Sequence, residues 1–172
     1  VKEAGFSIVS SLTKLLNMSL VHGKFPDNWK KANVTPIHKK GDKDNVNNYR
    51  PISVLPIVSK IFERIVFKHV YNHLRANNLI SKHQSGFQPD ESTVNQLAYM
   101  YHAFSDALDK KKDVRIVFCD ISKAFDKVWH EGIIFKLKQN GVDGKLLNWF
   151  KDYLNERKQR VVIKGQNSEW GK

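Results

Sequence analysis

The chain has 172 residues, of which 41% are hydrophobic, and this is enough for a folded domain with a core. Lysine and arginine number 29 against 17 acidic residues, so the net charge of +12 favours a polyanionic partner, either a nucleic acid or an anionic membrane surface. The single cysteine, Cys119, excludes an internal disulfide and a cysteine-based zinc cluster, and indicates an intracellular protein of the nucleus or cytoplasm.

Both ends of the sequence suggest a piece of a longer protein. It begins at Val1 without a methionine, and it ends on "SEWGK" directly after a strand-like run. No apolar stretch approaches the roughly 18 residues that span a bilayer, and the N-terminus lacks the apolar region of a signal peptide. We therefore expect no membrane partner.

The first half of the chain is predicted to be mostly helical. Hydrophobic residues recur at helical spacing within residues 6–21, and Gly23 ends this helix before a turn at "FPDNW". The run "ANVTPIHKK" is extended and leads through the polar loop "KKGDKDNVNNYR" into "YRPISVL". The longest helix is expected from Ser53, as its N-cap, to about Leu74.

The second half alternates strands and helices. A loop, "NNLISKHQSGFQPDEST", precedes a helix from about Thr93 to Leu108, and the β-branched and aromatic run "VRIVFC" predicts a strand. Helices are then expected over "DKVWHEGIIFKLKQNG", closed by Asn140 and Gly141, and over "KLLNWFKDYLNE", before a final strand at "QRVVIKG". This order indicates an α/β (α+β) fold that opens a sheet beside a mostly helical front half.

Asp120 is the first candidate for chemistry. It directly follows the apolar run "RIVFC", which predicts a carboxylate at the tip of a buried strand, satisfied either by hydrogen bonds or by a cation such as a metal ion. Asp126 is interpreted as a helix N-cap. A two-metal site needs carboxylates from separate segments, and the sequence has no adjacent Asp-Asp pair. Any such site is incomplete in this sequence.

Two loops carry the other candidates. Lys39, Lys40 and Arg50 flank "GDKDNVNNY", which is either a solvated loop with scattered charge or a cation clamp on a polyphosphate. No P-loop glycine pattern accompanies them. The loop "HQSGFQPDEST" is either a surface turn or a segment laid against a nucleic-acid strand, in which Phe87 stacks on a base or packs inward.

Taken together, three stretches resemble the reverse transcriptases of non-LTR (LINE-like, jockey-type) retrotransposons. They are "FPDNWKKANVTPIHKKGDKDNVNNYRPISVLPIVSKIFERIV", "HQSGFQPDEST" and "FCDISKAFDKVWHEGIIFKLKQNGVDGKLLNWFKDYLNERKQRVVIKG". The resemblance runs from about Phe6 to Trp170. It implies a right-hand polymerase fold, with a fingers region over residues 1–110, including an N-terminal helical extension over 1–30. Residues 111–172 match the first part of the palm, before its Asp-Asp turn.

The same resemblance implies roles for individual residues. Asp120 matches the first catalytic aspartate, which binds two Mg²⁺ (or Mn²⁺) ions together with the backbone carbonyl of Ile121. Phe125 matches the aromatic residue that excludes a ribose 2′-hydroxyl. Lys39, with Lys40 as the alternative, and Arg50 match the cations that bind the incoming triphosphate.

Template and partner assignments follow from the same family. The template-side loop contributes Gln84, Ser85 and Gln88, the last standing where many relatives carry a basic residue. The implied partners are an RNA template, a DNA primer, deoxynucleoside triphosphates, and the remaining palm and thumb of the same polyprotein. Because these later segments hold the other metal ligands, we expect this chain alone not to polymerise.

Two other functions remain open from the sequence. A catalytically dead, basic nucleic-acid-binding relic or co-opted module fits the charge equally well, and its binding would depend steeply on salt but not on Asp120. A metal-dependent nuclease would need a carboxylate cluster that the sequence does not show.

Overall fold

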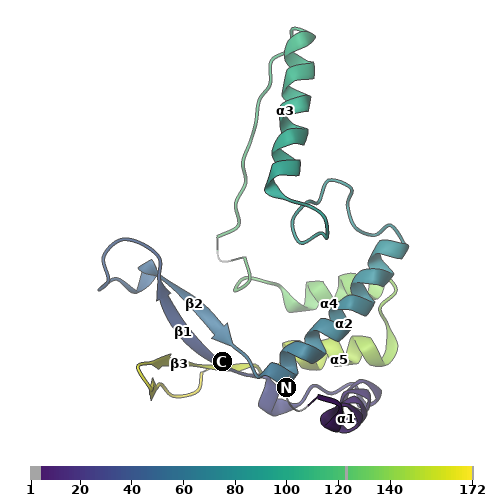
Figure 1. Ribbon diagram of the computed structural model, residues 1–172, viewed down its shortest axis with the longest axis vertical. Coiled ribbons are helices and arrows are strands. Elements are labelled where there is room, and N and C mark those ends of the chain that lie inside the picture. Colours follow the sequence, from purple (N-terminus) through teal and green to yellow (C-terminus); the bar gives the residue numbers. More distant parts are fainter. Residues whose placement is uncertain (1–4, 123, 172) are drawn as a thin grey trace. The chain divides into compact units, whose positions relative to one another are not determined.

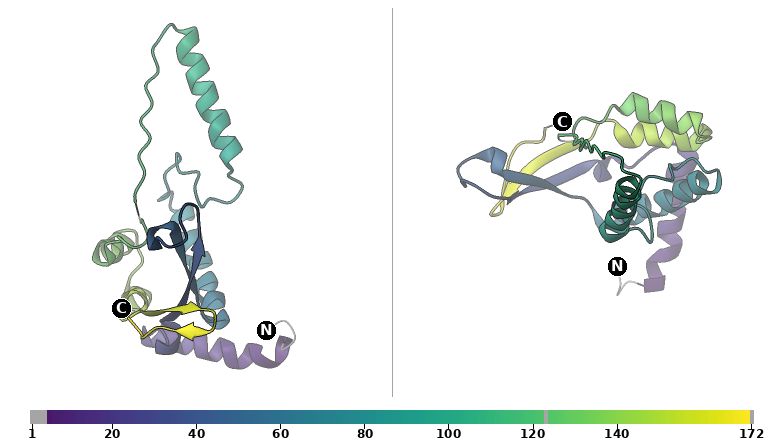
Figure 2. Two further views of the ribbon diagram at one scale, coloured as in Figure 1. Left: turned by 90° about the vertical axis from the view of Figure 1, so that its left-hand side faces the viewer. Right: turned by 90° about the horizontal axis from the view of Figure 1, so that it is seen from above.

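The computed structural model describes residues 5–122 and 124–171, which fall into two units (Figures 1 and 2). The first unit comprises residues 5–72 and 129–171, and the second comprises residues 73–128. The first unit contains helices α1 (Val9–His22), α2 (Ile57–Ala76, whose last turn belongs to the second unit), α4 (His130–Gln139) and α5 (Gly144–Leu154), and strands β1 (Lys31–His38), β2 (Tyr49–Val54), β3 (Lys158–Ile163) and β4 (Gln166–Asn167). Helix α3 (Thr93–Asp109) belongs to the second unit. Short 3₁₀ turns cover Gly5–Ile8, Asp27–Trp29 and Val46–Asn48.

The expected helices are present; α3 starts at Thr93 as predicted, whereas the other four start at different residues. Gly23 ends α1 in the left-handed conformation at φ 61°, and its N–H bonds the Leu20 carbonyl. The prediction that Ser53 caps the long helix is wrong, because Ser53 lies in β2 opposite Val34. Helix α2 begins only after Pro56, since a proline disfavours helical geometry at the residue before it.

One mixed sheet holds the strands of the first unit in the order β2-β1-β3-β4. Strand β1 pairs antiparallel with β2 and parallel with β3, and the parallel register sets Lys31 beside Lys158. The predicted strands at "ANVTPIHKK" and "QRVVIKG" are therefore confirmed, and they are neighbours. Helices with a small sheet match the predicted α/β class. No helix among the described residues is long and apolar enough to cross a membrane.

The core of the first unit is an aromatic cluster between α1, α2 and α5. Phe25 lies at its centre, with its ring 5.3 Å from Trp149, 5.0 Å from Tyr153 and 6.3 Å from Phe62. Trp149 is only 1% exposed, and its indole N–H donates to the Ser19 hydroxyl at 3.0 Å. The sequence run "FPDNW" therefore supplies a core residue and is more than a turn.

Beside this core, the Asp152 carboxylate of α5 gathers three donors. It accepts hydrogen bonds from the Phe25 amide at 2.8 Å and from Lys24 at 3.0 Å, and it pairs with Lys30 at 2.9 Å. The Lys30 side chain is 3% exposed, and Asp152 is 15% exposed. Burial raises the pKa of Asp152, but the hydrogen bonds from Lys30, Lys24 and the Phe25 amide outweigh burial and hold that pKa below its ordinary value.

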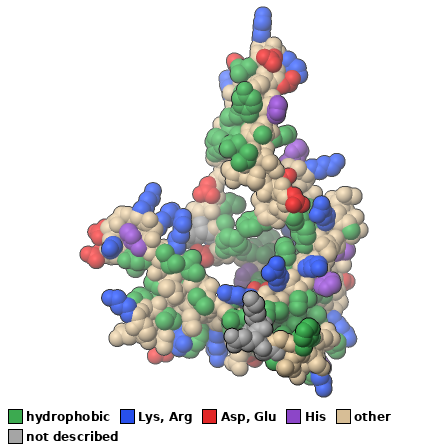
Figure 3. All heavy atoms as spheres, in the orientation of Figure 1, with side chains coloured by type: hydrophobic (Ala, Val, Ile, Leu, Met, Phe, Trp, Pro, Cys, Tyr) green, Lys and Arg blue, Asp and Glu red, His purple; other side chains and the backbone are tan. Residues whose placement is uncertain are grey.

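None of the described residues of the second unit is buried. Hydrophobic side chains are exposed along α3 (Figure 3). The predicted strand at "VRIVFC" is wrong, because residues 113–121 have no regular secondary structure. A strand needs a neighbour to pair its N–H and C=O groups, and no described segment supplies one here.

Replacing a core ring tests the aromatic cluster. Phe62 has 0% exposure, so Phe62→Ala should lower the free energy of unfolding by about 3–5 kcal/mol, measured by urea denaturation followed by tryptophan fluorescence. Phe67 of the same helix is 60% exposed and serves as the control, with Phe67→Ala expected to cost far less. Equal losses in the two variants would contradict the packing described.

The Asp152 contacts predict a pH dependence. At neutral pH, Asp152→Asn should lower the free energy of unfolding by about 3 kcal/mol, because it removes the negative charge that pairs with the buried Lys30 ammonium. Since the folded-state pKa of Asp152 is lowered, this contribution is present above the unfolded pKa of about 3.9 and is lost as the pH falls through the folded value. The difference between wild type and variant should therefore shrink below about pH 4.

The exposed i,i+4 pair Asp106–Lys110, at 2.7 Å, gives the matched control for that experiment. Asp106→Asn should change the free energy of unfolding by less than about 1 kcal/mol at neutral pH. If Asp152→Asn behaved like Asp106→Asn, the ion network would not stabilise the first unit.

Candidate nucleotide-binding and metal site

The β1–β2 hairpin positions the predicted triphosphate cations. Arg50 lies opposite Ile37 in the antiparallel register, and the Lys39 amide donates to the Asn48 carbonyl at 2.8 Å just beyond the strand. Opposed residues share a face of a sheet and successive residues alternate, so Lys39 falls on the face of Arg50 and Lys40 on the other. With the pairing continued by one residue beyond His38, Lys39 and Arg50 become diagonal neighbours on one face of the hairpin.

The loop between these cations is held by its own hydrogen bonds. Asn48 donates from its side chain to the Asp42 carbonyl at 2.8 Å, and the Tyr49 hydroxyl donates to the Lys43 carbonyl at 2.9 Å. Asp42 and Asn45 each accept from an amide two residues on. This bonding favours a shaped loop over a freely solvated one.

Within the described part of the chain, the hairpin cations form no ion pair with an acidic side chain. Among the described residues, the ion pairs at 4.0 Å or less involve Lys24, Lys30 and Lys110, and none of Lys39, Lys40 or Arg50. All three hairpin cations are exposed. Their charge is available to an anionic ligand from solution.

Asp120 lies in the second unit, at the end of the irregular segment, and it is exposed. The expectation of a carboxylate on a buried strand tip is therefore wrong in this structure. Its neighbours Ile121 and Phe125 are 72% and 84% exposed. Asp126 does not cap a helix, because α4 begins at His130 with Trp129 as its N-cap. Lys123, between Asp120 and Phe125, lies outside the described residues, as do residues 1–4 and 172 at the ends of the expected fingers and palm regions.

The donors around Asp120 do not fit a complete metal centre. Mg²⁺ prefers oxygen ligands in an octahedron, and Asp120 with a neighbouring carbonyl supplies only part of such a set. Within the part of the chain that the structure describes, no group of three or more His, Cys, Asp or Glu side chains could hold a metal ion. A two-metal site at Asp120 would require carboxylates from elsewhere.

The predicted template-side loop is ordered against α3. The Ser85 hydroxyl donates to the Gln96 side chain at 2.7 Å, and Gln84 donates to the Gly86 carbonyl at 3.2 Å. Phe87 has φ 61° and is 88% exposed, so it does not pack inward. The structure places Gln84, Ser85 and Gln88 in one loop of the second unit.

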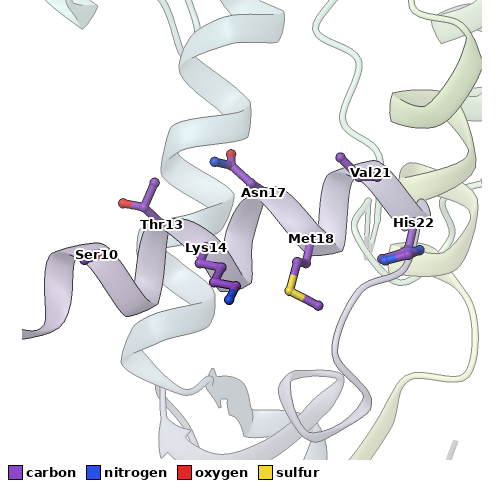
Figure 4. A pocket seen from close by; sticks show the side chains of 7 residues that line it. All are labelled: Ser10, Thr13, Lys14, Asn17, Met18, Val21 and His22. Carbon is purple, nitrogen blue, oxygen red and sulfur yellow. The ribbon is translucent and has the colours of Figure 1, made fainter.

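Two surface hollows of the first unit contain none of these residues. One follows a single face of α1, where Ser10, Thr13, Lys14, Asn17, Met18, Val21 and His22 line it (Figure 4). The other is an apolar groove between α2, α4 and α5, with Phe67, Ile133 and Phe150 among its walls. The polar side chains of the first hollow all come from one helix, and the second hollow is mostly apolar, so neither brings polar groups from several segments together as a catalytic site does.

Sequence reasoning missed the residues that fix the hairpin and the sheet. The asparagine-rich composition of "DKDNVNNY" signals local side-chain-to-backbone bonds and could have identified Asn48. The alternation in "KQRVVI" places Lys158 and Arg160 on one face. Pairing of that strand with β1 has no local signal, because the two are far apart in sequence.

Exposed cations on a shaped hairpin suit the binding of an anionic ligand. Residues 37–171 match the family described as reverse transcriptase (RNA-dependent DNA polymerase). The chain belongs to the reverse transcriptase family, and the resemblance to non-LTR retrotransposon enzymes is confirmed.

Individual relatives come from transposable elements. The chain is 36% identical over 138 residues to the probable RNA-directed DNA polymerase from transposon X-element of Drosophila melanogaster, covering 80% of the chain and 15% of that protein. It is 34% identical over 158 residues to the RNA-directed DNA polymerase from mobile element jockey of the same organism, covering 91% and 17%. A Pol polyprotein from retrotransposable element R2 of Popillia japonica is 27% identical over 148 residues, covering 86% and 20%. The chain thus spans at most a fifth of the length of these three relatives.

Gly41 tests the shape of the hairpin loop. It has φ 84°, and a Cβ there would lie 2.7 Å from the Asn48 side-chain nitrogen, which already bonds the Asp42 carbonyl. Gly41→Ala should therefore cost about 1–2 kcal/mol and speed hydrogen exchange of the Lys39 amide. Gly86→Ala is the control, because nothing lies within 4 Å of a Cβ at Gly86. An unchanged exchange rate in Gly41→Ala would show that the loop is not held as described.

Proposed function

We propose that this chain is the front part of an RNA-directed DNA polymerase. Residues 1–110 form the fingers, with the N-terminal extension over 1–30, and residues 111–172 form the first part of the palm. The observation that supports the proposal is the β1–β2 register, which pairs Arg50 with Ile37 and whose continuation puts Lys39 on the face of Arg50, in a chain of the reverse transcriptase family. Two cations on one hairpin face suit the adjacent phosphates of a nucleoside triphosphate.

In the proposed reaction, a primer 3′-hydroxyl attacks the α-phosphorus of a deoxynucleoside triphosphate. A new P–O bond to the primer forms, the bond to the β-phosphate oxygen breaks, and pyrophosphate leaves. Lys39 and Arg50 hold the β- and γ-phosphates in line and offset the charge of the leaving group. Lys40, on the opposite face of the hairpin, remains the alternative to Lys39.

Asp120 and the Ile121 carbonyl are the proposed metal ligands of this chain. When bound, Mg²⁺ or Mn²⁺ would neutralise charge on the reacting oxygens. Phe125 would contact the sugar and exclude a 2′-hydroxyl. Because the described donors are too few, the remaining ligands must come from other parts of the polypeptide.

The proposed partners follow from the assignment of the chain to an RNA-directed DNA polymerase. An RNA template would contact the ordered loop that contains Gln84, Ser85 and Gln88, and a DNA primer would supply the attacking hydroxyl. The remaining palm and thumb belong to the same polyprotein. The net charge of +12 supports a nucleic-acid partner.

A second candidate is a basic nucleic-acid-binding module without catalysis. The exposure of Asp120, with no described carboxylate cluster beside it, favours this alternative for the isolated chain. The variant Asp120→Asn distinguishes the two candidates. It should abolish primer extension by the polymerase but leave RNA binding by the module unchanged.

The hairpin cations test the triphosphate assignment. In a polymerase of the relatives' length that carries this chain, Lys39→Ala and Arg50→Ala should each raise the KM for deoxynucleotide about tenfold to a hundredfold, because each removes a charge-assisted hydrogen bond. They should also slow the chemical step, read from single-turnover primer extension. Lys43→Ala, in the same loop, is the matched control. A larger effect from Lys40→Ala than from Lys39→Ala would reassign the contact.

Phe125 tests sugar selection in the same enzyme. Phe125→Val should raise the relative incorporation of ribonucleotides on the order of tenfold or more, because it opens space beside the 2′ position. The measurement is the ratio of kcat/KM for the two sugars. Phe118→Val, an equally exposed ring in the preceding segment, should leave this ratio unchanged. An unchanged ratio in Phe125→Val would contradict the assignment of Phe125 to sugar selection.

A further inference from the structure

The loop between β1 and β2 is held by side chains at the ends of these two strands. Three consecutive loop carbonyls each accept a hydrogen bond from such a side chain: Gly41 from His38 at 3.0 Å, Asp42 from Asn48 at 2.8 Å and Lys43 from Tyr49 at 2.9 Å. The three donor residues are half-buried, whereas residues 39–47 between them are exposed. The side chains at the strand ends therefore determine the course of the loop.

The contact of His38 with the loop has a defined direction. A backbone carbonyl oxygen only accepts hydrogen bonds, so the Nε2 atom of the His38 ring carries the hydrogen and donates it to Gly41. The bond joins two residues that are three positions apart in the sequence. It therefore encloses Lys39 and Lys40, the two lysines considered for the triphosphate, between its ends.

The strand register fixes the place of the His38 ring. His38 pairs with Tyr49 across the hairpin, and the two rings meet edge to face with their centroids 5.3 Å apart. The Lys39 amide bonds the Asn48 carbonyl, so the neighbouring pair of His38 and Tyr49 is of the kind that shares no backbone hydrogen bond and has closer side chains. The contact with Tyr49 thus restricts the orientation of the imidazole.

The segment of Lys39 and Lys40 is consequently tied at both ends. Its first amide donates to the Asn48 carbonyl at 2.8 Å, and the carbonyl of Gly41, directly after it, accepts from His38 at 3.0 Å. A lysine on such a fixed backbone loses less conformational freedom when it binds an anion than a lysine on a mobile loop. The hydrogen bond of His38 therefore bears on the affinity of Lys39 for a phosphate.

His38 itself lies on the other face of the hairpin from the proposed phosphate contacts. Successive residues of a strand alternate between the two faces, so His38 and Tyr49 are opposite to Ile37, Arg50 and Lys39. A side chain on that face does not touch an anion held between Lys39 and Arg50. Any effect of His38 on such an anion must pass through the backbone of the loop.

We propose that His38 is a positioning residue for the triphosphate site, which it orders through its hydrogen bond to the Gly41 carbonyl. The inference rests on the proposed function, because it takes Lys39 as a ligand of the triphosphate. His38 holds the segment of Lys39 and Lys40 in place before the nucleotide arrives, which reduces the conformational entropy lost on binding. For this role the side chain at position 38 must supply a donor at the place of Nε2.

Two substitutions separate the donor of His38 from its ring. His38→Phe keeps an aromatic ring against Tyr49 and removes the donor, whereas His38→Gln replaces the ring by an amide whose nitrogen can take the place of Nε2. In a polymerase of the relatives' length that carries this chain, His38→Phe should raise the KM for deoxynucleotide roughly threefold to tenfold, the effect of one hydrogen bond. His38→Gln should keep the KM within about twofold of wild type. His69→Phe, at an exposed position of α2, is the control and should leave the KM unchanged.

The rate of the chemical step gives a second distinction. At saturating deoxynucleotide, Lys39 is still present in His38→Phe and binds the phosphate, so the single-turnover rate of primer extension should stay within about twofold of wild type. Lys39→Ala, in contrast, should slow this step. A rate in His38→Phe that falls as far as in Lys39→Ala would overturn a role limited to positioning.

A double-mutant cycle distinguishes an effect through Lys39 from a general loosening of the hairpin. In the Lys39→Ala background, His38→Phe should raise the KM by less than about twofold, because the side chain that it positions is already missing. The same increase with and without Lys39 would overturn the proposal. So would equal KM values for His38→Phe and His38→Gln.

The hydrogen bond can also be measured in the 172-residue chain without nucleotide. The carbon-13 resonance of the Gly41 carbonyl, which responds to hydrogen bonding, should shift in His38→Phe and stay near its wild-type position in His38→Gln. An unchanged resonance in His38→Phe would overturn the proposal.

Failure of this inference can be told apart from failure of the proposed function. If Lys39→Ala raises the KM while His38→Phe does not, the role of His38 is refuted and the triphosphate assignment stands. If Lys39→Ala and Arg50→Ala both leave the KM unchanged, the triphosphate assignment fails, and the role of His38 at that site fails with it even where the Gly41 resonance shifts.

Discussion

The architecture of the first unit depends on Lys30, which joins a helix to a sheet. Its buried ammonium pairs with Asp152 of α5 at 2.9 Å, while its carbonyl accepts the Lys158 amide at 3.1 Å, where β3 begins. One residue thus fixes where the last helix lies against the "FPDNW" segment and in which register the following strand meets β1. A buried lysine is tolerated here because a carboxylate and the surrounding hydrogen bonds compensate its charge. The position of Arg160 beside Asn33 follows from that register.

Local signals predicted most of the helices and two strands of this fold. The helix ends at Gly23 and Asn140 and the start at Thr93 follow from capping chemistry that lies within a few residues. The features that could not be predicted depend on contacts between residues far apart in the sequence. Ser53 resembles an N-cap until its pairing with Val34 is known, and Asp126 resembles one although α4 begins only at His130.

The residues of the candidate site differ in the same way, since some could be placed from local sequence and Asp120 could not. The Lys39–Arg50 pair could be reasoned from motif and alternation, because a hairpin is a local structure. Asp120 could not be placed, since a strand at "VRIVFC" requires neighbours that the described residues do not provide. The metal-binding role proposed for this aspartate rests on the resemblance of its motif, and its surroundings in the second unit do not by themselves reveal that role. The hairpin forms by pairing of segments close together in the sequence, whereas a strand that ends at Asp120 would need partner strands from elsewhere.

The parallel pairing of β1 with β3 also has a consequence for synthesis on the ribosome. Residues 31–34 leave the ribosome roughly 130 residues before their partners at 158–161, a delay of about 6–25 seconds at typical elongation rates. During this interval, the β3-facing edge of β1 has no strand to pair with, and Lys30 lacks Asp152. Nascent chains could pair through this edge, and Lys31, the first residue of β1, places a charge at the exposed site.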